Sequence, residues 1–303
     1  MPHDTHIAEA LMNKDSKKSS LLEKSASYVA IILTAIMIGL KIYGWSISNS
    51  LSILSSLTDS FMDIVVSGIN LAAIYYALKP ADEDHRYGHT AIEDIAGFFQ
   101  ASMLVGTSLL IAVEAVKRFI NPIQANAQTD LAFNIMVVCL ILTLLIVLYQ
   151  KFVVYKMKSI IVAADSMHYL SDLLTTAAVL ASLYLWNTYK LGWVDPLLSI
   201  VIISIILWGA VKIGYQSYKN LMDAEMDDDA RQEIIDCINS QAGHMGFHDL
   251  RTRCSGRKSF VQLHLELDKN LPFQEAHDIA ENVENKLQDL LGNADVIVHQ
   301  DPM

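Results

Sequence analysis

The chain has 303 residues, 52% of them hydrophobic, and its mean hydropathy of +0.32 is higher than that of most soluble domains of this size. The net charge of −11 is unevenly placed, because residues 222–303 hold 17 Asp and Glu against 7 Lys and Arg, whereas residues 1–221 hold 16 against 15. Three cysteines without a CxxC pair argue against a disulfide framework or a thiolate zinc finger, and the lack of a basic stripe argues against nucleic-acid binding.

Residues 1–24 are polar and carry four lysines, without the apolar core or cleavage site of a signal peptide. We expect a cytoplasmic N-terminal tail here. After it, the sequence offers six apolar stretches, each long enough for the roughly 20 residues that a membrane-spanning helix needs. These stretches are residues 26–47, 51–78, 92–119, 130–155, 160–187 and 191–218. The sequence therefore predicts an all-α transmembrane domain of six helices over residues 25–221.

Lysine and arginine in the flanks of the stretches indicate their direction across the bilayer. The N-terminus, the 79–91 loop, the 151–158 loop and the end of the sixth stretch together hold eleven of them, whereas the opposite side holds three. Both termini are therefore expected in the cytoplasm, and so is the acidic domain of residues 222–303.

Charged residues inside two of the stretches carry the functional signal. Asp59 and Asp63 are four residues apart in the second stretch, and His168 and Asp172 have the same spacing in the fifth, so each pair lies on one helix face. Three unpaired aspartates at mid-membrane depth would cost roughly 8–10 kcal/mol on insertion scales. Lys41 lies near the outer end of the first stretch, where we expect it to snorkel outward. A bound cation is then the simplest compensation for the acids.

Both pairs lie about 9–13 residues into stretches that run in opposite directions, so they would meet near the middle of a ~30 Å apolar layer. Three carboxylates and one imidazole suit tetrahedral Zn²⁺, with Fe²⁺, Cd²⁺, Co²⁺ and Mn²⁺ also possible, whereas Mg²⁺ and Ca²⁺ prefer oxygen alone. Protons would compete for the same ligands, so proton influx could release the metal outward. The alternative is a polar network that only fixes helix packing. Asp165 is read as a vestibule or helix-start residue, or one that supports the ligands from behind.

The loop after the second stretch carries a second candidate group. Asp82, His85 and His89 have the spacing D-x2-H-x3-H, which suits a surface metal site but leaves the fourth ligand unassigned. The alternative is a solvated polar loop.

The tail has the pattern of a small α+β domain. Helices are predicted at 227–241 and 272–291, and strands at 249–254, 259–268 and 295–300, which gives the order α-β-β-α-β. Five of the ten histidines of the chain lie in residues 222–303. If the sheet brings them together, they could hold one or two Zn²⁺ ions, and the alternative is ordinary surface histidines. The candidate ligands are His248, His264, His277, His299 and Asp301.

These patterns resemble the cation diffusion facilitator family over about residues 20–303, and most closely its bacterial zinc and ferrous-iron efflux branch. Besides the two pairs within the spans, the following segments are similar to that branch: Ser56–Ser60, Pro80–Asp82, Arg86–His89, His248–Arg253, His264–Asp268, Glu275–His277 and His299–Pro302.

The resemblance implies proton-coupled Zn²⁺ export across the bacterial inner membrane by a homodimer, with a ferredoxin-like (metallochaperone-like) cytoplasmic domain that forms the dimer. It implies three metal sites: a transport site of Asp59, Asp63, His168 and Asp172; a loop site of Asp82, His85 and His89; and a two-metal site of His248, His264, His277, His299 and Asp301.

The chain departs from the branch at Ala91, where a lysine usually follows the loop histidine by two residues. That lysine is thought to form an ion pair with an acid near the start of the tail, here Asp223. In this chain, Lys79 or Arg86 would have to supply the positive charge for this ion pair in the dimer. Two alternatives stay open: Fe²⁺ or Cd²⁺ as the main cargo, or a membrane metal sensor or storage protein. An intramembrane metalloprotease is disfavoured, because its HExxH helix is missing.

Overall fold

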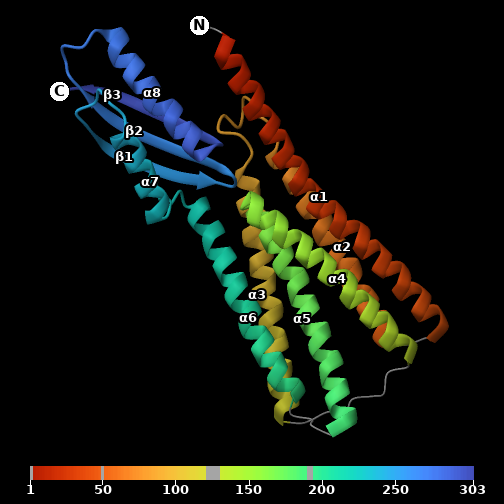
Figure 1. Ribbon diagram of the computed structural model, residues 1–303. Helices are drawn as coiled ribbons and strands as arrows, with labels where there is room; N and C mark the ends of the chain where they lie inside the picture. Colours follow the sequence, from red (N-terminus) through yellow and green to blue (C-terminus); the bar gives the residue numbers. More distant parts are fainter. Residues whose placement is uncertain (1–2, 49–50, 121–129, 190–193) are drawn as a thin grey trace. The chain divides into compact units, whose positions relative to one another are not determined.

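The computed structural model describes residues 3–48, 51–120, 130–189 and 194–303 (Figure 1). The chain divides into a helical unit of residues 15–217 and a second unit that consists of residues 218–303 together with the first residues of the chain, up to Lys14. Residues 191–193, where the sixth predicted span begins, lie outside the described part.

Six long helices account for the apolar region, one for each predicted stretch. They are α1 (His3–Ser48), α2 (Leu51–Ala77), α3 (Ala91–Ile120), α4 (Asp130–Met157), α5 (Ile160–Tyr189) and α6 (Val194–Leu221). Most of the expected N-terminal tail is helical, since α1 begins at His3 and no glycine or proline interrupts residues 3–24.

Within the described ranges, five helical segments are long and apolar enough to cross a membrane by length and composition. They are Leu21–Ile47, Ser56–Ala77, Ala91–Lys117, Phe133–Met157 and Leu197–Leu221. Among the residues that the structure describes, α5 is not one of the five, although it has 30 residues; its first half carries Asp165, His168 and Asp172. The apolar helices show that the chain is a membrane protein.

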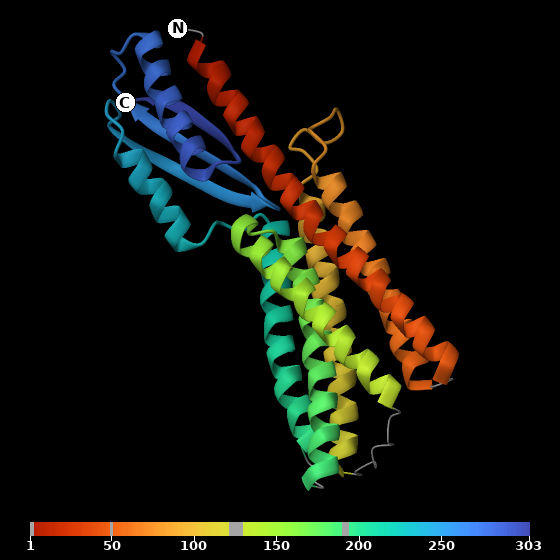
Figure 2. The ribbon, with the colours of Figure 1, turned by 45° about the vertical axis from the view of Figure 1, so that its right-hand side comes forward.

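Helix α5 is well placed to present these residues to its neighbours. It contacts α2, α3 and α4 within the helical unit. Figures 1 and 2 show α3, α5 and α6 running side by side, and α1 running along α2. One buried cluster joins α1, α4 and α5 through Met37, Ile146 and Tyr169.

The second unit has the predicted order α-β-β-α-β. Its elements are α7 (Asp228–Asn239), β1 (Gly246–Ser255), β2 (Lys258–Leu267), α8 (Phe273–Leu291) and β3 (Ala294–Pro302). The strands lie in the order β1-β2-β3, with β1 antiparallel and β3 parallel to β2. A tight turn at Gly256, whose φ of 54° suits glycine, joins the first two strands.

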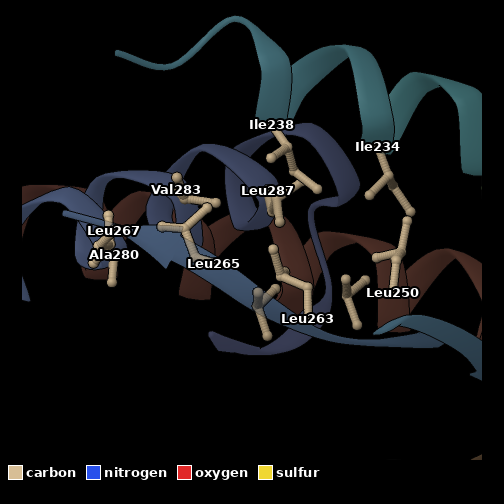
Figure 3. Packing of buried hydrophobic residues seen from close by; sticks show 11 residues of the cluster. Ile234, Ile238, Leu250, Leu263, Leu265, Leu267, Ala280, Val283 and Leu287 are labelled. Carbon is tan, nitrogen blue, oxygen red and sulfur yellow. The ribbon is translucent and has the colours of Figure 1, made fainter. Parts of the chain in front are cut away.

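Both helices of this unit pack on the same face of the sheet (Figure 3). Ile234 and Ile238 of α7 and Val283 of α8 contact alternate residues of β2, such as Leu263 and Leu265. Because side chains alternate along a strand, the residues between them, including His264, point to the opposite face. The sheet therefore has one apolar face under the helices and one polar face.

Candidate metal sites

The first candidate site lies between α2 and α5. His168 Nε2 on α5 is 3.0 Å from Asp63 Oδ1 on α2. Asp172, four residues further along α5, has its Oδ2 atom 3.7 Å from the same nitrogen. One donor atom from each of the three residues lies within 4.8 Å of the others. The structure thus brings together three of the four residues that the sequence placed here.

These distances fit the edges of a coordination shell. At bond lengths of about 2.1 Å, two ligands of a tetrahedral Zn²⁺ lie about 3.4 Å apart. The separations of 3.0 and 3.7 Å lie on either side of that value. The Oδ2 atom of Asp172 is also enclosed and has no hydrogen-bond partner among the described residues. An enclosed carboxylate oxygen without a donor is costly, and a bound dication would satisfy it.

Asp59 is the expected ligand that stays outside the group. It is exposed on α2, one turn before Asp63, and the three-residue group does not include it. Residues i and i+4 of a helix are separated by about 6 Å along the axis, so Asp63 reaches His168 while Asp59 lies a turn away.

Lys41 corrects one of the expectations from sequence. Rather than snorkelling outward, it is buried, and its Nζ donates to the Ser56 carbonyl at 2.9 Å and to Ser60 Oγ at 2.7 Å. A long side chain snorkels only where nothing polar is within reach, and here α2 offers two acceptors. Lys41 is therefore held against α2 and does not extend outward as expected.

Asp165 lies at the centre of a buried polar network rather than in a vestibule. It is almost fully buried and accepts hydrogen bonds from Asn70 Nδ2 at 2.9 Å and from the side-chain amide of Gln150. A longer contact of 3.5 Å links it to Gln100 Nε2. These donors come from α2, α4 and α3, so one carboxyl on α5 joins four helices.

The network continues towards α1 through hydroxyl groups. The Tyr169 hydroxyl lies 2.9 Å from Ser67 Oγ on α2 and 2.9 Å from Thr34 Oγ1 on α1. Tyr169 is adjacent to His168 on α5, so Tyr169 and Asp165 together tie this segment of α5 to α1, α2, α3 and α4. Such ties fix the rotation of α5, which sets where His168 and Asp172 point.

The second candidate site is the loop between α2 and α3. Asp82 Oδ1 accepts from the backbone N–H of His85 at 2.7 Å and lies 3.1 Å from His85 Nδ1, while Asp82 Oδ2 lies 3.3 Å from His89 Nε2. All three residues form one group within 4.8 Å. His89 is buried edge-on against Tyr76, with ring centroids 4.8 Å apart, whereas the other two are exposed. The structure thus brings together all three predicted residues.

The third candidate site is a row of histidines across the polar face of the sheet. The strand register pairs His248 with His264 and His264 with His299. Asp301 Oδ2 lies 2.9 Å from His264 Nδ1 and 3.2 Å from His248 Nε2, and its Oδ1 lies 3.2 Å from His299 Nε2. One carboxylate therefore contacts three imidazoles, as a carboxylate that bridges two metal ions would.

Two acids of this site escaped the sequence analysis. Glu266 Oε1 lies 3.0 Å from His248 Nδ1, and its position two residues after His264 on the same strand face could have indicated it. Asp249 Oδ2 lies 3.9 Å from His264 Nε2, because a bulge between His248 and Arg251 turns an extra residue to the polar face. Asp249 has a φ of 49°, which is uncommon outside glycine, and sequence gave no sign of the bulge.

His277 is the predicted residue of this site that the structure does not bring in. It is exposed near the start of α8, where its ring stacks on Phe273 with centroids 6.4 Å apart. Helix α8 packs on the apolar face of the sheet, and the histidine row lies on the opposite face. The group of His248, His264 and Asp301 does not include it.

Two carboxyl groups of the loop and sheet sites are held in their ionised form. The hydrogen bond from His264 lowers the pKa of Asp301 below its ordinary value, and the nearby His299 and His248 act in the same direction. In the loop, the backbone N–H of His85 lowers the pKa of Asp82. Both acids are therefore ready to bind a cation near neutral pH.

The start of the tail is held within its own unit. Asp223, the acid expected to take part in the dimer interlock, accepts a hydrogen bond from Arg253 Nη1 at 2.9 Å. Ala91, which stands where the family lysine is expected, begins α3.

Comparison with known proteins gives matches over nearly the whole chain. Residues 27–222 match the family model of the cation efflux transmembrane domain, and residues 226–303 match that of the cation efflux protein cytoplasmic domain. The cation-efflux pump FieF of Shewanella oneidensis is 41% identical over 92% of this chain and 94% of its own length. FieF of Serratia proteamaculans is 40% identical over 93% of each chain, and protein p34 of Rickettsia rickettsii is 35% identical over 95% of each.

Proposed function

Because this chain belongs to the cation diffusion facilitator family and is a membrane transporter of divalent metal cations, we propose that it is a secondary transporter that exports Zn²⁺ in exchange for protons. The observation that carries the proposal is the meeting of Asp63 with His168 and Asp172 between two helices. Carboxylate oxygen and imidazole nitrogen are ligands that Zn²⁺ accepts in four-coordinate sites. Asp59, one turn before Asp63, supplies the fourth ligand when its exposed side chain turns towards the group.

Exchange follows from the chemistry of these ligands. Each must give up its proton before it binds the metal, so a proton that returns to the site displaces the metal. A site between helices can open to either side of the bilayer when the helices rock. Proton entry from outside then releases the metal there, and loss of the proton inside restores the binding form.

The other two groups serve the transporter outside the membrane. Asp82, His85 and His89 form a loop site, and His248, His264, His299 and Asp301 form a site for two metal ions on the sheet. In this proposal the protein is a homodimer in the bacterial inner membrane with both termini in the cytoplasm, and metal on the sheet stabilises the dimer. The match of residues 226–303 to the family's cytoplasmic domain supports this arrangement.

Transport by purified protein in sealed vesicles tests the proposal. We expect ⁶⁵Zn²⁺ to accumulate against its gradient when a proton gradient is imposed, and we expect Asp63→Ala to remove this flux. Asp289→Asn, an exposed acid of α8, is the control for loss of one carboxyl. Equal flux in the wild type and Asp63→Ala would end the transport role of this group. Zinc flux that no pH gradient alters would end the proton coupling.

A different main cargo is the nearest alternative, because the group is rich in carboxylate oxygen, which also suits Fe²⁺. Competition of Cd²⁺, Fe²⁺ and Mn²⁺ against ⁶⁵Zn²⁺ flux ranks the cargoes. If Fe²⁺ suppresses zinc flux at lower concentration than unlabelled Zn²⁺ does, iron is the better substrate.

A further inference from the structure

A buried ammonium group lies beside the α2–α5 site. Lys41 is the only lysine or arginine that is buried among the side chains described by the structure. It is held by two neutral acceptors, the Ser56 carbonyl at 2.9 Å and Ser60 Oγ at 2.7 Å. No ion pair joins it directly to a carboxylate of the described chain. Burying a charge is costly unless another charge compensates it, so helix packing alone does not explain a lysine here.

The position of Lys41 on α2 relates it to the metal ligands. Ser60 is adjacent to Asp59 and three residues before Asp63, so the acceptor hydroxyl is roughly 5 Å along the helix from Asp63 and near the same face. The ammonium is therefore hydrogen-bonded to the residue that directly follows Asp59 on α2. The ammonium is thus close enough to influence the acids but is held away from them by the two serines.

We propose that Lys41 is a fixed counter-ion of the transport site, a specificity-determining residue that sets how much positive charge the site accepts. With three ionised aspartates and a neutral imidazole, Lys41 leaves the empty site with a charge of minus two, which one dication neutralises. This inference rests on the proposed function, because it takes Asp59, Asp63 and Asp172 as the ligands of a transported metal.

The counter-ion has a consequence for transport rate. A site of three carboxylates without it would be left with one excess negative charge when a dication is bound. In a low-dielectric surrounding, that extra charge strengthens the hold on the metal and slows its release. Lys41 therefore weakens binding so that the metal can leave, which a transporter needs and a storage site does not.

Transport kinetics of the full chain in proteoliposomes test the inference, with ⁶⁵Zn²⁺ as substrate at pH 8, where protons compete least. Lys41→Gln removes the charge but keeps a donor for Ser60. We expect it to lower KM and kcat together, each by about tenfold. Lys41→Arg keeps the charge and is expected to stay within about twofold to threefold of the wild type for both constants. Lys156→Gln, an exposed lysine at the end of α4, is the control.

Three results would overturn the inference. They are a Lys41→Gln variant with KM and kcat of the wild type, one with a raised KM, and equal impairment of Lys41→Gln and Lys41→Arg. If Lys41→Gln does not yield folded protein, Lys41→Met keeps the apolar stem and is judged by the same pair of constants. Absence of zinc flux in the wild type would instead refute the proposed function, so the two failures are distinguishable.

Discussion

The α2–α5 group and the histidine row of the sheet use the same ligand chemistry but obtain it by different structural means. In the helical unit, an i,i+4 pair fixes His168 and Asp172 relative to each other, and Asp63 arrives from a second helix. In the sheet, strand register places His248, His264 and His299 in one row, although they are spread over 52 positions of the chain. The first arrangement changes when helices move, whereas the second is fixed as long as the sheet is folded.

The surroundings of the two groups also differ, because one is backed by a buried polar network and the other lies on an open face of a sheet. Behind His168, the carboxyl of Asp165 is buried among amides from α2, α3 and α4. The histidine row lies on the open face of a sheet whose other face carries the core. The α2–α5 group thus lies between helices, which can move relative to one another, whereas the histidine row lies on a sheet, which holds its residues in fixed register.

The largest expected effect separates the two groups by function. Asp172→Asn removes a charged ligand from the helical group, and we expect zinc flux to fall by more than about 100-fold. Asp278→Asn on the exposed surface of α8 is the control and should transport normally. Flux measured in proteoliposomes at equal protein density checks both variants. Normal flux in Asp172→Asn would break the comparison, because the helical group would then not be the transport site.

The next effect concerns the buried network. Asp165→Ala leaves the amides of Asn70 and Gln150 without their acceptor, and we expect a loss of about 3 kcal/mol in stability, since each buried unsatisfied donor costs about 1–3 kcal/mol. Asp165→Asn keeps one carbonyl acceptor and should lose less. Thermal unfolding of the full chain in detergent measures the difference, with Ser102→Ala on the exposed side of α3 as control. Equal stability of Asp165→Ala and the wild type would show that the network does not hold the helices together.

For each group, the sequence predicted which residues of one helix or strand share a face. It did not predict the contacts that depend on how separate helices and strands pack. The spacing of His168 and Asp172 was enough to place them on one face, and six apolar stretches were enough to predict six helices. Nothing in the spacing shows which rotation α1 takes, so sequence could not tell that Lys41 turns towards Ser60. The same holds for Asp165, whose partners lie on α2, α3 and α4.

In the sheet, alternation predicted the strands but not their irregularity. The apolar residues of β2 alternate as expected, and His264 lies on the opposite face. Asp249 joins that face only because β1 bulges between His248 and Arg251, a feature that depends on the pairing with β2. His277 is exposed on α8, and which side of the sheet α8 covers is decided by packing. Helix α8 covers the side away from the histidine row.

A smaller effect on transport, but a clear one on the tail, is expected from the histidine row. His264→Ala should reduce zinc flux by less than about tenfold, because in the proposed function the transported ion binds between α2 and α5 and not on the sheet. The same substitution should remove the protection from hydrogen exchange that zinc gives to the β2 and β3 amides. At a zinc concentration of 100 times the Kd, bound zinc stabilises the folded state by about 2.7 kcal/mol. His277→Ala is the matching variant. We expect it to leave the protection unchanged, because within one chain His277 lies away from the histidine row. Reduced protection would mean that His277 reaches the site in the dimer.

The smallest effect lies in the pH dependence of the sheet. The hydrogen bond from His264 lowers the pKa of Asp301 in the folded protein, so ionised Asp301 favours folding at pH values above the ordinary aspartate pKa of about 4. That contribution is lost as the pH falls through the lowered pKa. In the absence of metal, Asp301→Asn should therefore reduce the protection of β3 amides at pH 6 and have less effect below pH 4.

Hydrogen exchange of the wild type and Asp301→Asn, compared at each pH, measures this difference, since intrinsic exchange rates are nearly the same in both. Asp295→Asn at the start of β3, whose carboxylate pairs with Lys258 at 2.8 Å rather than with a histidine, is the matched control. If Asp301→Asn changes protection equally at pH 6 and below pH 4, the carboxylate does not act through its charge. Strand register alone would then hold the histidine row in place. The arrangement of the sheet group would not depend on the charge of its carboxylate.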